Sequence, residues 1–231
     1  MSLPLLILLG VLLSLDSGLF EALFLKRRAE SRHISSLSYK MLAAGGFCGT
    51  GLLMALYSGD SRGFLIFSGL ILGMLGDFFL GLRKVSSLDH RLFFGLGILA
   101  FSTGPIFYAA ALLRLNAFSP LPVAVIFLIL MLCTEAFLRV HQVKGRKVHI
   151  SALLYIGVEA FMCSVALMLA YQHTSLGSLL FVTGSFSFLA SDNLLAAFSF
   201  GDLSSGEVDQ ALHATYLGAQ LFIAWSILFL F

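Results

Sequence analysis

Long apolar runs separated by short polar segments dominate the chain. A helix needs about 20 mainly apolar residues to cross a bilayer, and eight stretches meet that condition. They cover residues 3–25, 39–58, 63–82, 92–113, 120–138, 150–171, 176–198 and 211–230. The pattern predicts an all-α, polytopic membrane bundle of eight transmembrane helices, with residues 1–231 forming a single transmembrane helical domain.

Composition supports an integral membrane protein. Hydrophobic residues make up 59% of the chain and charged residues only 11%, whereas an ordinary soluble domain is about 25% charged. The basic residues lie in short loops between apolar spans, so we expect no nucleic-acid partner. The three cysteines show no CxxC or Cys/His spacing, so neither a zinc site nor a disulfide framework is indicated, and we expect no metal or other cofactor.

Basic residues in alternate loops predict the orientation of the chain. Almost all of them lie in or around the first, third and fifth connections. Lys26, Arg27, Arg28, Arg32 and Lys40 surround the first, Arg83, Lys84 and Arg91 lie in the third, and Arg139, Lys144, Arg146 and Lys147 lie in the fifth. The positive-inside rule therefore predicts cytoplasmic odd-numbered loops and both termini outside. The seventh connection, residues 199–210, is acidic and does not follow the pattern, but acidic residues have little effect on topology. We expect a bacterial inner membrane, although the sequence also permits the endoplasmic reticulum.

Two aspartates lie inside predicted spans, one in each half of the chain. Asp77 occurs in GMLGDFFLGL and Asp192 in FLASDNLLAAF. A carboxylate at the centre of a membrane helix costs about 2.5–3.5 kcal/mol on insertion scales, so it normally faces a bundle interior or a wet cavity and marks a functional site. Both lie roughly one to two turns from the predicted cytoplasmic boundary, and His213 should lie close to the same layer. Glu159 should lie deeper, near the middle of its span.

The surroundings of the two aspartates suggest an internal repeat. Gly69 and Gly184 stand at the same spacing before Asp77 and Asp192, and a small residue directly precedes each Asp. Two four-helix halves would have the same orientation, so the repeat would be parallel with its axis along the membrane normal. That symmetry would bring the two carboxylates together near the axis. The alternative is that apolar helices resemble one another by composition.

Polar residues in several spans share helical faces. Gly69, Gly73 and Asp77 are spaced by four, and this small-residue pattern allows a neighbouring helix to approach closely, which turns Asp77 towards protein. In the last span, His213, Tyr216 and Gln220 form one face. For Tyr108 and Gln220, a hydrogen bond to a neighbouring helix is as good an explanation as a functional role.

Four motifs occur in order along most of the chain. They are Gly76-Asp77 followed by Leu80, Phe94-x-x-Gly97-x-x-x-Phe101 leading to Tyr108, Ser191-Asp192 with Ala196, and Thr215-Tyr216-x-x-Ala219-Gln220. In this order they resemble the lysoplasmalogenase family of eight-helix membrane proteins, also called YhhN-like. The family usually has a His three residues before the tyrosine of the fourth helix, where this chain has Pro105. If that His assists the chemistry, His213 is the candidate to replace it.

The resemblance implies hydrolysis of the vinyl ether bond of lysoplasmalogens, with a lysophospholipid in the bilayer as substrate. The products would be a fatty aldehyde and a glycerophospho-head group, either glycerophosphoethanolamine or glycerophosphocholine. Such a reaction begins with proton transfer to the β-carbon of the alkenyl chain and passes through an oxocarbenium ion. It therefore needs a protonated acid and a negative group, and two carboxyl groups in one low-dielectric layer supply both, because they resist ionising together.

Asp77 and Asp192 are therefore the predicted catalytic residues. Our first hypothesis makes Asp192 the acid and Asp77 the stabilising or water-activating carboxylate, although the sequence does not assign the two roles. The candidate substrate-binding residues are Tyr108, Asn193, His213, Tyr216, Gln220 and Glu159.

Three other functions stay open at this stage. A proton-coupled small-solute transporter also uses buried acids, but it predicts a polar path to both faces, whereas the polar residues here gather on one side. In a non-catalytic lipid-binding or packing subunit, Asp→Asn changes would alter stability and little else. A related hydrolase acting on another lysolipid or ether is kept open by Pro105. The oligomeric state is not predicted.

Overall fold

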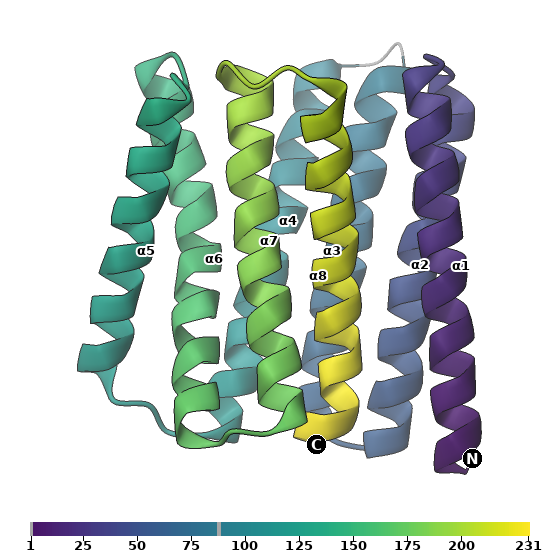
Figure 1. The fold of residues 1–231 in the computed structure, drawn as a ribbon, viewed down its shortest axis with the longest axis vertical. Coiled ribbons are helices and arrows are strands. Elements are labelled where there is room, and N and C mark those ends of the chain that lie inside the picture. Colours follow the sequence, from purple (N-terminus) through teal and green to yellow (C-terminus); the bar gives the residue numbers. More distant parts are fainter. Residues whose placement is uncertain (1, 87–88) are drawn as a thin grey trace.

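The eight predicted helices are present in the computed structural model, which describes residues 2–86 and 89–231 (Figure 1). All eight are long and apolar enough to cross a membrane, and the described part of the chain contains no strand. The helices are α1 (Leu3–Ala29), α2 (His33–Ser58), α3 (Ser61–Val85), α4 (His90–Leu115), α5 (Pro120–Val140), α6 (Arg146–Gln172), α7 (Leu176–Phe200) and α8 (Gly206–Leu230).

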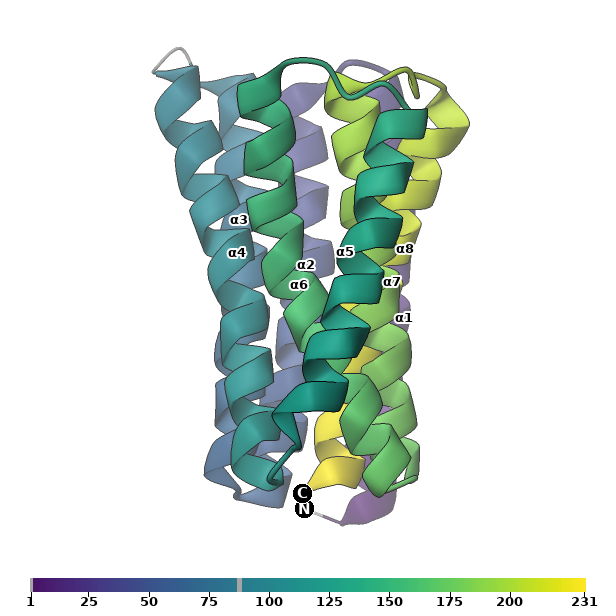
Figure 2. The same cartoon turned by 90° about the vertical axis from the view of Figure 1, so that its left-hand side faces the viewer.

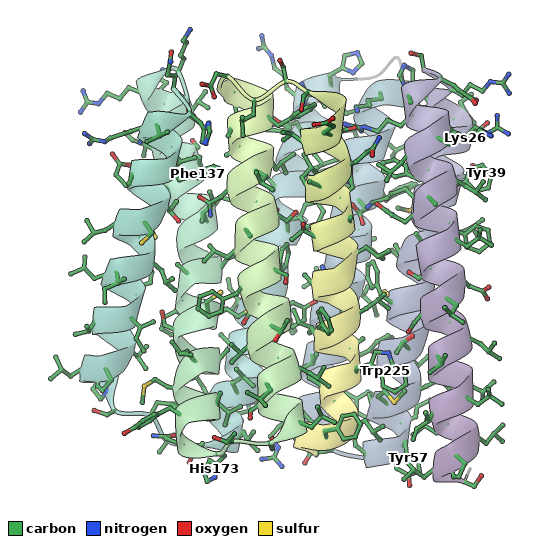
Figure 3. The ribbon with its side chains drawn as sticks, viewed as in Figure 1. Lys26, Tyr39, Tyr57, Phe137, His173 and Trp225 are labelled. Atoms are coloured by element: carbon green, nitrogen blue, oxygen red, sulfur yellow. The ribbon has the colours of Figure 1, made fainter. Side chains whose placement is uncertain are left out.

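The helices extend beyond the predicted apolar spans mainly at one end of the bundle. This end holds the connections that follow α1, α3, α5 and α7, and we call it the basic end; Lys26 lies there, whereas Tyr57 and His173 lie at the opposite end with both termini (Figure 3). α2 begins at His33 rather than at residue 39, and α8 at Gly206 rather than at residue 211. These first turns carry polar residues, so hydropathy alone does not count them as part of a span.

The longer α2 changes the position of Lys40. The sequence placed this lysine beside the first connection, but it lies about two turns inside α2 and only 4% of it is exposed. The predicted span 39–58 already contained Lys40 as its second residue, and the structure adds that its side chain is buried in the bundle.

Six helices form a closed ring in which each packs on the next. The order is α2, α3, α4, α6, α7, α8 and back to α2, with an additional contact between α3 and α8 (Figures 1 and 2). α1 packs outside the ring against α2 and α8, and α5 packs outside it against α6 and α7. The ring encloses space that side chains from several helices can share.

The packing order is the one expected of two parallel four-helix halves. The contacts α1–α2, α2–α3 and α3–α4 have counterparts in α5–α6, α6–α7 and α7–α8, and the halves join through α4–α6 and α2–α8. α3 and α7 are both 25 residues long, and Asp77 occupies the same position in α3 as Asp192 does in α7. The two carboxyl groups therefore stand at similar depth on different sides of the ring.

Small residues allow the close helix crossings near the two aspartates. A Cβ on Gly76 would lie 2.6 Å from the ring of Phe101, and one on Gly97 would lie 2.7 Å from Leu80. A Cβ on Gly184 would lie 2.9 Å from the carbonyl oxygen of Ala219. The glycines of the sequence motifs thus have a packing role, because they let α3 approach α4 and α7 approach α8.

Candidate functional site

A cavity of about 710 Å³ occupies the basic-end half of the ring. Its lining comes from α1 and the six ring helices, and α5 contributes none. Asp77 and Asp192 line it together with His213 and Tyr216, so the structure brings four of the sequence-predicted residues to one cavity. The apolar part of the wall includes Leu80, Phe94, Ile98, Phe101, Leu195 and Phe198.

Asp77 lies beside a buried ion pair. Lys40 Nζ is 3.0 Å from Glu21 Oε1 and 3.9 Å from Asp77 Oδ1. The side chains of these three residues are between 4% and 9% exposed. Asp77 Oδ2 has no hydrogen-bond partner among the residues that the structure describes. One lysine thus stands between two carboxyl groups from different helices, in a setting where unpaired charge is costly.

Lys40 also contacts two aromatic rings. Its ammonium lies 5.0 Å from the centroid of the Phe24 ring and 4.8 Å from that of Tyr216, distances at which a cation is attracted to the ring face. The sequence analysis did not place Lys40 or Glu21 in the site. The available signal was the run of residues before the second apolar span, which continues the helical pattern and carries Lys40 into the bundle.

Asp192 has a different environment. Tyr155 of α6 donates a hydrogen bond from its hydroxyl group to Asp192 Oδ2. The hydroxyl of Ser191 donates to the carbonyl oxygen of Leu212 at 2.9 Å, which fixes α7 against α8 directly beside Asp192. Within the described residues, Asp192 makes no ion pair with Lys, Arg or His. The sequence analysis did not assign Tyr155 to the site.

Glu159 is fully buried and lies behind the cavity wall. It is absent from the cavity lining, and its nearest polar neighbours are Asp192 and Tyr155. Neither of its carboxyl oxygens has a partner with hydrogen-bond geometry. The expected substrate contact of Glu159 is therefore not seen, and its contact is instead with the carboxyl group of Asp192.

A row of polar groups continues from Asp77 below the cavity. Tyr216 lies between Asp77 and Gln220 and interacts with both, and Tyr108 donates its hydroxyl hydrogen to Gln220 Oε1 at 2.8 Å. Gly73 leaves room for this row, because a Cβ there would lie 2.7 Å from Gln220 Nε2 and 3.2 Å from the Tyr216 hydroxyl. Tyr108 and Gln220 support the cavity floor but do not line it.

Two other sequence-predicted positions lie outside the cavity lining. Asn193 donates from Nδ2 to the carbonyl oxygen of Leu189, one turn earlier in its own helix, at 2.8 Å. Pro105 is buried inside α4 and does not line the cavity either. The position where the family usually has a histidine is therefore outside the cavity lining in this protein. His213 does line it, with Nδ1 4.0 Å from Glu21 Oε1 and Nε2 3.7 Å from Asp209 Oδ1.

The mouth of the cavity at the basic end is positively charged. Arg28, His33, Arg83, Lys84 and Lys147 line it, and among the described residues of the lining the only carboxyl groups are those of Asp77 and Asp192 in its depth. Asp209 neutralises Arg28 through hydrogen bonds of 2.6 and 2.7 Å. Lys84 and Lys147 form no ion pair with any described residue. The mouth can therefore attract an anion, whereas the inner part of the cavity is lined by the two aspartates and by apolar side chains.

The described residues contain no group of three or more His, Cys, Asp and Glu side chains placed to hold a metal ion.

The comparisons with known proteins bear on residues 36–227, which match the model of the YhhN family. This match includes both aspartates, Lys40 and Tyr155, and it covers most of α2 through α8. The searches of curated proteins and of solved structures found no match.

Proposed function

Because the chain belongs to the YhhN family, the family of lysoplasmalogenases, we propose that it hydrolyses the vinyl ether bond of a lysoplasmalogen inside the ring cavity. The observation that carries this proposal is the placement of Asp77 and Asp192 on the wall of one apolar cavity with a basic mouth. Its volume of about 710 Å³ lies within the range typical of small-molecule sites, about 300–1,000 Å³.

The charge distribution orients a lysophospholipid in the cavity. Its anionic phosphate would bind at the mouth near Arg83, Lys84 and Lys147, and its single alkenyl chain would extend along the apolar wall. Lys84 and Asp77 lie on the same helix, and at 1.5 Å per residue the carboxyl group is roughly 10 Å deeper than the lysine. The glycerol backbone would span this interval and bring the vinyl ether to the layer of the two aspartates.

The reaction has three stages, which are protonation of the vinyl ether, addition of water and collapse of the hemiacetal. Asp192 gives its proton to the β-carbon of the alkenyl chain, which breaks the carbon–carbon π bond and forms an oxocarbenium ion at the carbon next to oxygen. Asp77 stabilises that cation and then accepts a proton from the water that attacks it, so that a hemiacetal forms. Collapse of the hemiacetal breaks its bond to the glycerol oxygen, which takes the proton from Asp77. The hemiacetal hydroxyl gives its proton to Asp192 and becomes the aldehyde carbonyl, so both carboxyl groups return to their starting state. The net change is one water consumed, with one fatty aldehyde and one glycerophospho-head group released.

The neighbouring groups suit these roles. Tyr155 holds Asp192 by a hydrogen bond, and Tyr216 and Gln220 extend from Asp77 with polar atoms available for water. Positioned acid–base groups typically accelerate a reaction about 10²–10⁴-fold. Ethanolamine and choline head groups both fit the proposal, because the recognised charge is that of the phosphate.

The position of the cavity supports hydrolysis over transport. A transporter needs polar access from both faces, whereas the half of the ring away from the basic end is packed with fully buried side chains. These include Met54, Ile66, Leu70, Phe181, Ile223 and Ile227. The basic residues at the cavity end also support our proposal that this end is cytoplasmic, that both termini lie outside and that the protein resides in a bacterial inner membrane.

The proposal is tested by substrate class and by isotope labelling. The purified protein is incubated with lysoplasmenyl-ethanolamine or lysoplasmenyl-choline in heavy water, and the released aldehyde is analysed by mass spectrometry. We expect aldehyde with one deuterium on the carbon next to the carbonyl, and no product from the matched saturated alkyl ether. No aldehyde from either vinyl ether substrate, with the protein folded, contradicts the assignment. Release of fatty acid from the matched acyl lysolipid would instead indicate a hydrolase for another lysolipid.

A further inference from the structure

Two equivalent carboxyl groups need different charge states to act as acid and as base, and their neighbours make them unequal. Asp77 lies 3.9 Å from the ammonium of Lys40, whereas no described cation forms an ion pair with Asp192. Resting on the proposed function, we infer that Lys40, held in place by its ion pair with Glu21, is a positioning residue that keeps Asp77 ionised and so leaves the proton of the acid pair on Asp192 and Glu159.

The groups around Asp77 come from four other helices. Lys40 and Cys48 face it from α2, Glu21 from α1, Tyr216 from α8 and Asp192 from α7. Lys40 is the single cation in this set, and its two nearest carboxyl groups are those of Glu21 and Asp77. Opposite charge at this distance favours the ionised form of a carboxyl group.

Charge balance supports an ionised Asp77 even though Glu21 shares the same lysine. Lys40 interacts with Arg28 as well as with the two carboxyl groups, and Lys84 interacts with Arg28 and Asp209. Arg83 also interacts with Lys84, so this side of the cavity holds four basic side chains, Lys40, Arg28, Lys84 and Arg83. The carboxyl groups that face them are Glu21, Asp77 and Asp209, so even with Asp77 ionised the positive charge remains in excess.

The Asp192 side has the opposite character. Its polar neighbours are the hydroxyl of Tyr155 and the carboxyl group of Glu159, which is fully buried. Two adjacent carboxyl groups without a cation cannot both ionise in a low-dielectric interior, and they share a proton. This pair therefore carries the acid, with Glu159 acting on Asp192 from behind the cavity wall and not on the substrate.

The test compares variants that differ in one charge. Lys40→Met alone leaves Glu21 buried without a partner and would risk unfolding, so the lysine is removed in a Glu21→Gln background. Activity requires ionised Asp77 and therefore falls as pH decreases. We expect Glu21→Gln to move this acidic limb of the pH–rate profile to lower pH, because it removes a negative charge near Asp77. Glu21→Gln/Lys40→Met should move the limb to higher pH than in Glu21→Gln by about one pH unit or more.

The Lys40→Arg variant, which keeps the charge, serves as control and should retain the wild-type limb. Equal acidic limbs in Glu21→Gln and Glu21→Gln/Lys40→Met would overturn the inference, since a merely structural pair would change the rate and not its pH dependence. The inference would also be overturned if the acidic limbs of Glu21→Gln and Glu21→Gln/Lys40→Met moved together away from the wild-type limb and still coincided.

A second readout does not depend on activity and separates this inference from the proposed reaction. Infrared absorption of protonated carboxyl groups is recorded at neutral pH for the wild type, Asp77→Asn, Glu21→Gln and the double variant Asp192→Asn/Glu159→Gln, because the remaining member of the pair keeps the shared proton when only one is replaced. We expect intensity to be lost only in Asp192→Asn/Glu159→Gln. Loss in Asp77→Asn would overturn the inference even if aldehyde is produced. A wild type that releases no aldehyde, while intensity is still lost only in Asp192→Asn/Glu159→Gln, would contradict the proposed function and leave the charge assignment supported.

Discussion

Asp77 on α3 and Asp192 on α7 occupy the same position in helices of equal length and line one cavity, although the two helices do not touch within the described residues. Their positions are alike and their neighbours are not. Lys40 lies beside Asp77, and Tyr155 with Glu159 lies beside Asp192. A parallel two-half arrangement thus supplies two carboxyl groups at one depth, and the residues around them give each a different chemical role.

The hydrogen bond from Tyr155 to Asp192 predicts a defined loss of rate. Tyr155→Phe keeps the ring and removes the hydroxyl, so we expect kcat to fall about tenfold while the protein stays folded. Tyr171→Phe is a matched control, because Tyr171 lies on the same helix but is 82% exposed. Steady-state aldehyde release measures both. A wild-type rate in Tyr155→Phe would show that this hydroxyl has no role in positioning the acid.

The close approach at Gly73 predicts a variant that affects the site more than the fold. Gly73→Ala would place a Cβ 2.7 Å from Gln220 Nε2, which displaces the polar row next to Asp77. We expect activity to fall about tenfold or more, with a small change in thermal unfolding because alanine favours helix. Gly45→Ala is the control, since no atom lies within 4 Å of its Cβ. Equal activities of the two variants would contradict a role for this row.

The basic mouth predicts an effect on substrate binding. Removing the charges in Arg83→Gln/Lys147→Gln should raise KM about fivefold for each charge and leave kcat nearly unchanged, because these side chains contact the phosphate and not the reacting bond. Arg114→Gln removes a charge at the opposite end of the bundle and should change neither constant. If the double variant lowered kcat with an unchanged KM, phosphate recognition at the mouth would be ruled out.

Asp60, in the connection between α2 and α3, predicts a pH-dependent contribution to stability. It caps α3 by accepting from the backbone N–H of Arg62 at 2.8 Å, and the hydrogen bonds and charge of Arg62 lower the pKa of Asp60. A lowered pKa means that the stabilisation is present above the usual value of about 3.9 and is lost as pH falls below it. Asp60→Ala should cost about 1 kcal/mol at neutral pH and progressively less under acidic conditions.

Thermal unfolding in detergent from pH 7 to pH 3 measures this difference. Asp60→Asn keeps a capping oxygen without the charge, so it should lose less stability than Asp60→Ala at neutral pH. A destabilisation of Asp60→Ala that stayed constant over this range would show that the ionised form is not what stabilises the cap.

The helices and the two aspartates could be predicted from the sequence because both depend on short stretches of chain and not on how the helices pack. Apolar length defines a span, and a short carboxylate such as Asp77 cannot reach water from inside it. The structure confirms the eight helices and places Asp77, Asp192, His213 and Tyr216 on one cavity.

What the sequence did not predict depends on helix rotation and on where helices begin. Hydropathy placed Lys40 at the edge of the span 39–58, whereas the helix begins at His33 and packing buries the lysine about two turns inside it. Glu159 was correctly placed in the bundle, but only the packing of α6 on α7 shows that it faces Asp192 and not the cavity. Asn193 points to its own helix backbone, a detail that periodicity does not reveal.

The central claim is that Asp77 and Asp192 together catalyse vinyl ether hydrolysis. The most direct test measures aldehyde released from lysoplasmenyl-ethanolamine by the wild type, Asp77→Asn, Asp192→Asn and Glu135→Gln. Glu135 is the control, because it pairs with Arg139 and His149 outside the cavity lining. We predict that both Asp variants remain folded and lose activity by at least about a hundredfold, while Glu135→Gln keeps it. If either Asp variant were folded and released aldehyde as fast as Glu135→Gln, catalysis by the two aspartates would be contradicted.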